Sequence, residues 1–212
     1  MTPTDPLRDA ADTMRAVRDR CVWTQQIDHR ALVPYLVEES AELIDAVEEG
    51  DRDELREELG DLLWQVLFHA EIASRDTQDP FDIDDVARGL TDKMVRRHPH
   101  VFGDAVANTP EEVLVHWNAA KAAEKSSRTS VLDGVSERMP SLALAQKLVS
   151  KGSQAGVRVA PAEGPATEPE LGDALLALVA TARANGWDAE RALRERLRGL
   201  ESEIRRAEAG SA

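Results

Sequence analysis

Two pairs of acidic residues in the first third of the chain have the residue types and spacing of a metal site. Glu39 and Glu42 form the first pair, and Glu58 and Asp61 form the second. The members of each pair are three positions apart, so in a helix they share one face. The break at Gly50 is so short that two helices joined there must fold back as an antiparallel hairpin.

Such a hairpin would bring the four carboxylates together. A rise of about 1.5 Å per residue places Glu39 and Asp61 roughly 16 Å from the turn, and Glu42 and Glu58 about 12 Å from it. Carboxylates this close raise one another's pKa unless a cation joins them. Oxygen ligands suit a hard ion, Mg²⁺ with Mn²⁺ as a substitute. A solvated acidic flank is the ordinary alternative for one pair, but two pairs matched in phase and height favour a metal.

The apolar pattern predicts how the two helices, expected over about 31–49 and 51–75, pack together. Each has a stripe at helical spacing, and we expect the stripes to face each other with the acids on their common flank. The second helix is apolar nearly all round, which is typical of burial on several sides. A chain of this size covers such a helix poorly, so a homodimer is expected. The stripes are Leu32, Leu36, Leu43 and Val47, and Leu55, Leu59, Leu62 and Val66.

Composition narrows the class of protein. The 212 residues are 42% hydrophobic and only 4% aromatic, which favours an all-α fold with a domain and a smaller appendage. The net charge of −14 argues against a nucleic-acid duplex or an anionic membrane as partner. The single cysteine, Cys21, excludes an intramolecular disulfide. Without a signal peptide or a membrane-spanning stretch, a cytoplasmic protein is expected.

The chain divides by composition into four segments. A segment rich in Pro, Gly and Ala predicts a flexible linker. After it, 170–179 echoes 58–67 and repeats one acidic pair, which indicates a degenerate half-repeat with too few carboxylates for a catalytic metal. Chance similarity between two Leu-rich helices is the alternative. The expected segments are a domain with the acidic pairs over 1–125, a helical extension over 126–155, the linker over 156–169 and C-terminal helices over 170–212.

The motifs resemble one known family. The string Leu36-Val37-Glu38-Glu39-x-x-Glu42, followed by Glu57-Glu58-Leu59-Gly60-Asp61, resembles the metal-binding signature of MazG-type nucleoside triphosphate pyrophosphohydrolases. Further similar blocks begin at Cys21, Gln65, Arg96 and Trp117, so the resemblance runs from about Leu7 to Lys125. It implies an all-α, dimeric enzyme, with the tail as a shortened second MazG-like domain. The implied reaction is Mg²⁺-dependent hydrolysis of nucleoside triphosphates, non-canonical or damaged ones included, to monophosphate and pyrophosphate.

The resemblance also implies roles for individual residues. The metal ligands would be Glu39, Glu42, Glu58 and Asp61, and Glu38 would support them or act as the base that activates water. Lys93 and Arg97 would grip phosphates, with Trp117 and Lys121 closing the site from another helix and Trp23 contacting the substrate. The expected catalytic residues are thus Glu38, Glu39, Lys93 and Arg97.

Some of these residues have ordinary alternatives. Lys93 and Arg97 could be solvated cations at a helix end, and Trp117 could belong to the core. The loop also departs from the family pattern, with Val22 in place of Pro and Thr24 in place of Asp. The preferred base is therefore not predicted.

Two other functions are alternatives to the hydrolase. A di-iron carboxylate bundle needs Glu-x-x-His pairs, but Glu42 is followed at i+3 by Asp45, and Asp61 by Trp64. A helical dimer that binds nucleotides as a sensor, without hydrolysis, would explain the altered loop. The complete set of four carboxylates argues against that alternative.

Overall fold

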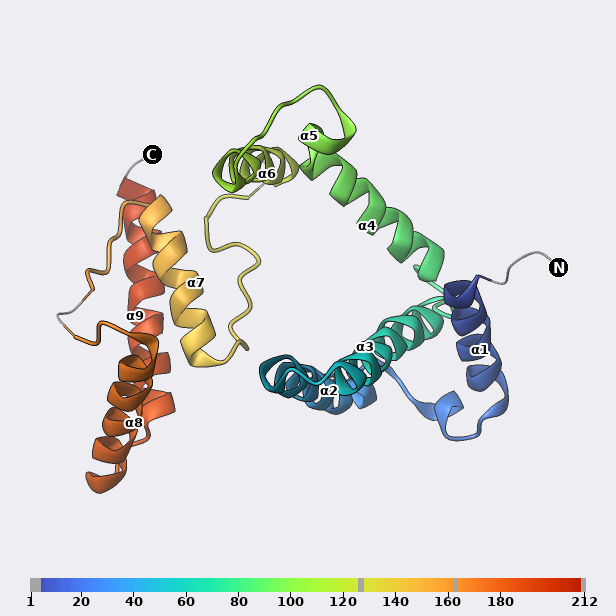
Figure 1. Ribbon diagram of the computed structural model, residues 1–212, viewed down its shortest axis with the longest axis horizontal. Helices are drawn as coiled ribbons and strands as arrows, with labels where there is room; N and C mark the ends of the chain where they lie inside the picture. Colours follow the sequence, from blue (N-terminus) through green and yellow to red (C-terminus); the bar gives the residue numbers. More distant parts are fainter. Residues whose placement is uncertain (1–4, 126–127, 162–163, 211–212) are drawn as a thin grey trace. The chain divides into compact units, whose positions relative to one another are not determined.

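The computed structural model describes residues 5–125, 128–161 and 164–210, and the regular elements in these ranges are all helical (Figure 1). The predicted all-α fold is confirmed. The chain forms two compact units, residues 1–122 and 123–212. Among the described helices, none combines the length and the apolar character needed to cross a bilayer.

The first unit has three main helices, a short helical turn and a segment that leads away from them. Aspartates begin the helices, because the side chains of Asp28, Asp51 and Asp82 accept backbone N–H groups at the first turns of α2, α3 and α4. The predicted bounds of α2 and α3 agree within about two residues, but the two shortest helices were missed. The elements are α1 (Pro6–Arg20), η1 (Thr24–Gln26), α2 (His29–Glu49), α3 (Arg52–Ala73), α4 (Ile83–Arg97), α5 (Pro99–Phe102) and α6 (Pro110–Glu124).

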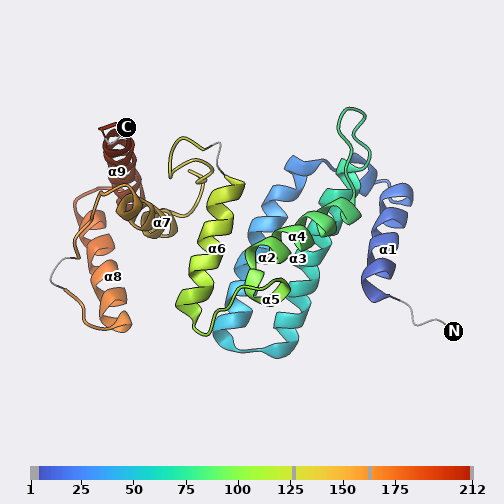
Figure 2. The same ribbon diagram turned by 90° about the horizontal axis from the view of Figure 1, so that it is seen from above.

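Helices α2 and α3 form the predicted antiparallel hairpin, which Figure 2 shows side by side. Gly50 ends α2 with a φ of 77°, a left-handed conformation that other residues rarely adopt, and its N–H donates to the carbonyl of Ala46 at 3.1 Å. The Asp51 carboxylate then accepts from the backbone N–H groups of Asp53 and Glu54 at 2.8 and 3.1 Å. The chain therefore reverses within two residues, and this sets the register of the two helices.

Half of each expected apolar stripe is exposed, although Leu32 is buried and Leu43, Leu55 and Leu62 are half-buried. Leu36, Val47, Leu59 and Val66 are 40–59% exposed, whereas Leu32 and Ala46 on α2 and Gln65 on α3 are at most 2% exposed. The four exposed side chains therefore lie beside the line where the two helices meet and not on it. Periodicity identifies an apolar face, but it does not say which neighbour covers that face.

The core of the first unit lies where α1 meets α2 and α3. Phe68 and Leu32 are fully buried and Ile27 nearly so, and partly buried side chains of α1 and α3 pack against them. Beside this core, the Nδ1 atoms of His29 and His69 lie 2.7 Å apart, with stacked rings. The contact joins the first turn of α2 to the last part of α3. Burial, and then the neighbouring His29, lower the pKa of His69, which favours the neutral form of that ring.

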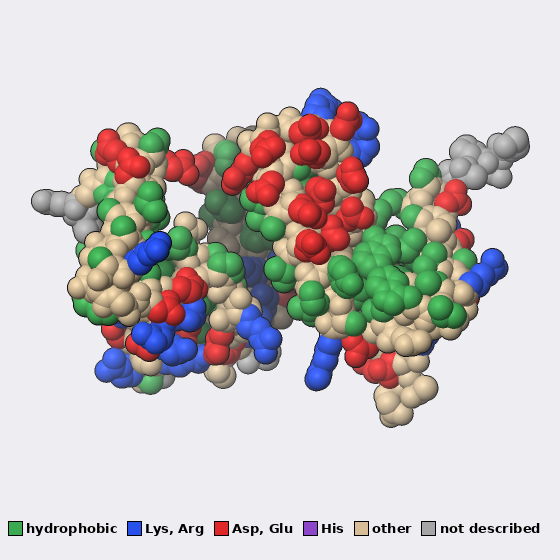
Figure 3. Space-filling model, turned by 90° about the horizontal axis from the view of Figure 1, so that it is seen from below, with side chains coloured by type: hydrophobic (Ala, Val, Ile, Leu, Met, Phe, Trp, Pro, Cys, Tyr) green, Lys and Arg blue, Asp and Glu red, His purple; other side chains and the backbone are tan. Residues whose placement is uncertain are grey.

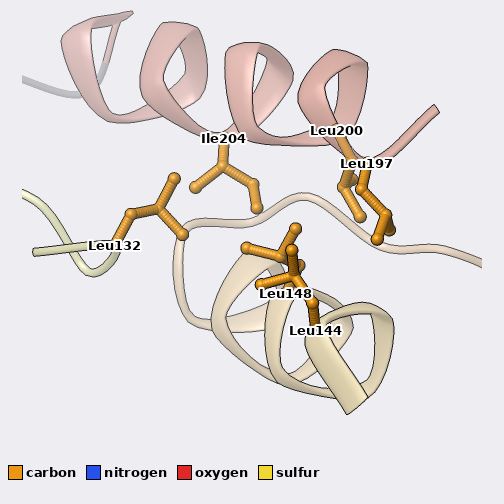
Figure 4. Close-up of a cluster of buried hydrophobic side chains, with 6 residues drawn as sticks. All are labelled: Leu132, Leu144, Leu148, Leu197, Leu200 and Ile204. Carbon is orange, nitrogen blue, oxygen red and sulfur yellow. The ribbon is translucent and has the colours of Figure 1, made fainter. Parts of the chain in front are cut away.

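The second unit contains α7 (Ser141–Gln154), α8 (Glu168–Ala184) and α9 (Ala189–Gly210). Its core joins α7 to α9, as Figure 4 shows. Gly152 permits the close approach, since a Cβ there would lie 3.1 Å from the carbonyl oxygen of Val157 and 3.2 Å from Ile204. The buried core residues are Leu132, Leu144, Leu148, Leu197, Leu200 and Ile204.

The segment expected as a linker lies within this unit, although residues 162 and 163 fall outside the described residues. Helix α8 begins at Glu168, one residue before the expected end of the linker. Glu170 accepts from the backbone N–H of Ala166 at 2.8 Å, and the Thr167 hydroxyl caps the same turn. Glu170 therefore caps its own helix, whereas Glu58, its counterpart in the echo, lies in the interior of α3.

Candidate active site

Three acidic side chains meet between the two helices of the hairpin. Glu39 of α2 and Glu58 and Asp61 of α3 each offer one carboxylate oxygen, and these atoms lie within 4.8 Å of one another. Below, these three residues are called the acidic group. Each is half-buried. The hairpin turn accounts for the meeting, because it places Glu39 and Asp61 at nearly the same distance from Gly50 along the two helices.

The acidic group faces the interior of the hairpin and does not lie on its flank. Glu39 is seven residues from Leu32 on one side and from Ala46 on the other, and both are buried. Positions seven apart on a helix lie within about 20° of each other, so Glu39 points the same way as these two. Glu58 has the same relation to the buried Gln65. The carboxylates thus occupy the packing line between the helices.

This position disfavours the charged form of Glu39 and Glu58. Partial burial is the largest cause that raises the pKa of Glu39, followed by the charges of Asp61, Glu42 and Glu58. Burial also comes first for the raised pKa of Glu58, before Glu42 and Asp61. In addition, Glu58 Oε2 is shielded from solvent and has no hydrogen-bond partner. A divalent cation would neutralise the repulsion and coordinate this oxygen, so the donor set fits such an ion.

The two other acidic residues of the expected site lie at the edge of this group. Glu42 is exposed and outside the 4.8 Å set, although its charge acts on both Glu39 and Glu58. Glu38 is exposed beside Glu39, and its charge is the weakest of those named for that residue. Three of the four expected ligands therefore meet, and the fourth lies close by.

The basic and aromatic residues expected at the site come from α4 and α6. The Arg97 guanidinium lies 4.9 Å from the centre of the Trp117 ring, and His98 meets the same ring edge-on at 5.3 Å. Lys93 precedes Arg97 by one turn, and Lys121 follows Trp117 by one turn; both are half-buried. Figure 1 shows α4 leading away from the hairpin toward α5 and α6 within one chain.

Trp23 lies in the loop after α1 and contacts an aromatic residue that sequence reasoning missed. Its ring is perpendicular to that of Tyr35 with 6.5 Å between centres, and the two residues are 53% and 40% exposed. Tyr35 is four residues before Glu39 and so shares its side of α2. That spacing was the available signal. The pair presents exposed aromatic surface one helical turn from the acidic group.

The loop that carries Trp23 is held by Thr24, the residue that stands where the family pattern has Asp. Thr24 is 3% exposed, and its hydroxyl donates to the carbonyl oxygen of Val17 at 2.9 Å. The hydroxyl also lies 3.1 Å from the carbonyl oxygen of Cys21. Thr24 thus fastens the loop to the end of α1 and leaves Trp23 on the surface.

Comparison with known proteins places this site in context. A sequence profile for the MazG nucleotide pyrophosphohydrolase domain matches residues 27–102, which include the whole acidic group. A nucleoside triphosphate pyrophosphohydrolase of Escherichia coli K12 is 33% identical over 98% of this chain and 88% of the relative. A nucleoside triphosphate pyrophosphohydrolase/pyrophosphatase MazG of Thermotoga maritima is 36% identical over 89% of this chain and 79% of the relative. A nucleoside triphosphate pyrophosphohydrolase of Mycobacterium tuberculosis is 48% identical over 71% of this chain but only 46% of the relative.

The raised pKa values lead to a first prediction about metal-free protein. A carboxyl group whose pKa is raised on folding stabilises the fold at pH values below its ordinary pKa of 4.5. That contribution is lost as the pH rises through the pKa of the folded protein. Glu58→Gln removes one of the repelling charges, so we expect its melting temperature in EDTA at pH 7 to exceed that of the wild type by a few degrees. At pH 4 the difference should shrink.

Thermal unfolding followed by circular dichroism measures this difference. Glu57→Gln is the matched control, because it removes the same charge from an exposed neighbour outside the acidic group, and its effect should be smaller. A Glu58→Gln variant that melts below the wild type at pH 7 would show that this carboxylate stabilises the hairpin.

Proposed function

Since this chain belongs to the MazG nucleotide pyrophosphohydrolase family and is a nucleoside triphosphate pyrophosphohydrolase, we propose that its reaction depends on a divalent cation held by the acidic group. The observation that carries the proposal is the meeting of three carboxylates, one with a shielded and unpartnered oxygen, between two helices. The products are a nucleoside monophosphate and pyrophosphate.

The cation is Mg²⁺, with Mn²⁺ as a substitute, because every donor in the site is a carboxylate oxygen. Glu39, Glu58 and Asp61 would hold it, with Glu42 adjacent. When bound, the ion neutralises phosphate charge and lowers the pKa of a coordinated water. This requirement is strong here, since the chain carries a net charge of −14 and its substrate is also an anion.

The chain's own groups perform the remaining steps. Glu38 is exposed next to Glu39 and can take a proton from the attacking water. The water oxygen forms a bond to the α-phosphorus as the bridging P–O bond between the α- and β-phosphates breaks, and the electron pair leaves with the departing pyrophosphate. Lys93 and Arg97 stabilise the negative charge on the pyrophosphate, with Lys121 beside them. Two aromatic rings contact the nucleoside. One belongs to Trp117, which also lies against Arg97, and the other belongs to Trp23.

The active form is a homodimer. Large apolar side chains of α2 and α3 are 36–63% exposed, and Figure 3 shows an apolar area beside an acidic area on this part of the molecule. Contiguous apolar surface of this kind is typical of a protein interface. These side chains are Val33, Leu36, Val37, Ile44, Val47, Leu59, Leu63 and Val66.

A dimer would also complete the site. Within one chain the C-terminal end of α4 leads away from the hairpin that carries the acidic group (Figure 1). A second copy that covers the apolar face of the hairpin would bring its own α4–α6 segment toward those carboxylates. Lys93 and Arg97 would then act on substrate held by the acidic group of the partner copy.

Removing one carboxylate tests the metal site. Asp61→Asn should lower turnover of a mixed nucleotide panel with Mg²⁺ by about 100-fold or more, since even residues that only orient a metal ligand cost about 10–100-fold. Released pyrophosphate is the readout, and far-UV circular dichroism should stay unchanged. Asp53→Asn, which alters an exposed acid of the same helix, is the control. Wild-type protein that binds metal and nucleotide without turnover would identify a sensor instead.

Mixing two inactive variants tests whether the site is shared. Lys93→Ala alone and Asp61→Asn alone should each lose most activity. After joint refolding in equal amounts, half of the dimers are mixed, and each mixed dimer has one intact site, so about one quarter of wild-type activity should return. A mixture as inactive as its components would place Lys93 at the site of its own chain.

An apolar-to-charged substitution tests the interface. Leu59 is 53% exposed on α3, so Leu59→Asp should not disturb the fold of one chain, but it would bury a charge in the dimer. Light scattering after gel filtration should change from dimer mass to monomer mass. Leu7→Asp on α1, at 65% exposure, is the control and should remain dimeric. Wild-type protein of monomer mass at micromolar concentration would refute the dimer.

A further inference from the structure

Gln65 is a buried amide without a hydrogen-bond partner. The residue is 1% exposed, and neither Nε2 nor Oε1 has a partner among the described residues. Burying an amide in this way costs free energy, and an apolar side chain of the same length would not incur that cost. Its neighbours along α3, Leu67 and Phe68, are buried and apolar. Packing alone therefore does not explain an amide at this position.

The place of Gln65 on α3 relates it to the acidic group. Gln65 lies seven residues after Glu58 and four after Asp61. By the 100° rotation per residue, it is within about 20° of Glu58 and about 40° of Asp61, one turn farther from the hairpin turn. The amide thus lies on the same face of α3 as Glu58 and Asp61, and it is farther from the Gly50 turn than either of them.

The chemistry of the two groups is complementary. A glutamine amide offers two N–H donors, and an ionised carboxylate is an acceptor only. Gln and Asp four positions apart on a helix are within hydrogen-bonding reach. Carboxylates that ligate metals are usually held by such hydrogen bonds from groups that do not touch the metal themselves.

We propose that Gln65 is a positioning residue for the acidic group, and that its amide N–H donates to the Asp61 carboxylate when a divalent cation is held there. This inference rests on the proposed function. One oxygen of Asp61 is then fixed by the amide and the other is directed at the ion. The buried amide gains its missing partner in the same step, so the bond contributes to metal affinity rather than to the stability of metal-free protein.

The substitution Gln65→Met tests the proposal, because Met has similar length and volume but no N–H donor. Isothermal titration with Mn²⁺ alone, without nucleotide, should show affinity weaker than wild type by about 10–100-fold. In EDTA the variant should melt at or above the wild-type temperature, since it lacks the unpartnered amide. Leu67→Met changes a buried neighbour that lies outside the acidic group, and its Mn²⁺ affinity should match the wild type.

The outcomes separate this inference from the proposed function. If wild-type protein takes up no Mn²⁺, the metal site itself is refuted. If wild type and Gln65→Met bind Mn²⁺ equally, only the role of Gln65 is refuted. If Gln65→Met melts well below the wild type in EDTA, the amide has a structural role and the proposal is also wrong. Gln65→Asn keeps the amide but shortens the reach by one methylene, so it should bind Mn²⁺ weakly while folding like the wild type.

Discussion

Three carboxylates enclosed between α2 and α3 repel one another, and the rest of the hairpin must balance this repulsion. A two-residue reversal at Gly50 fixes the register of α2 and α3, and this register places Glu39 against Glu58 and Asp61. Repelling charges on a packing line oppose the association of the helices that carry them. The hairpin is therefore held by its turn, by the core around Phe68, and, in the proposed active state, by a cation between the carboxylates.

Local patterns predicted the hairpin helices well, because helix caps and apolar periodicity depend on residues that are close in the sequence. The bounds of the two hairpin helices were predicted within about two residues, since Asp28 and Asp51 are strong helix starts. The spacing of the acidic pairs also indicated that carboxylates would gather, and three of them do. The helical turns at Thr24 and Pro99 are too short to show a period, so they were missed.

Other features depend on contacts that no local pattern records. Leu36 and Leu59 were expected inside the hairpin, yet both side chains are at least 40% exposed. Tyr35 enters the site region through a contact with Trp23, twelve residues away in sequence. Gln65 reads as an ordinary polar residue of a helix until its burial is known. The segment that begins at Glu170 has residue types similar to those after Glu58, but the Glu170 carboxylate caps its own helix.

The loop before α2 contains one residue that holds its backbone in place and two exposed residues that do not. Thr24 holds the backbone through a concealed hydroxyl, while Val22 and Trp23 are 75% and 53% exposed and bear little of the structure. Substitutions at these two outer positions can accumulate without disturbing either the loop or the carboxylates of the hairpin. If Trp23 contacts the nucleoside as proposed, changes at these two positions would alter the surface offered to the base and leave the carboxylates of the hairpin in place.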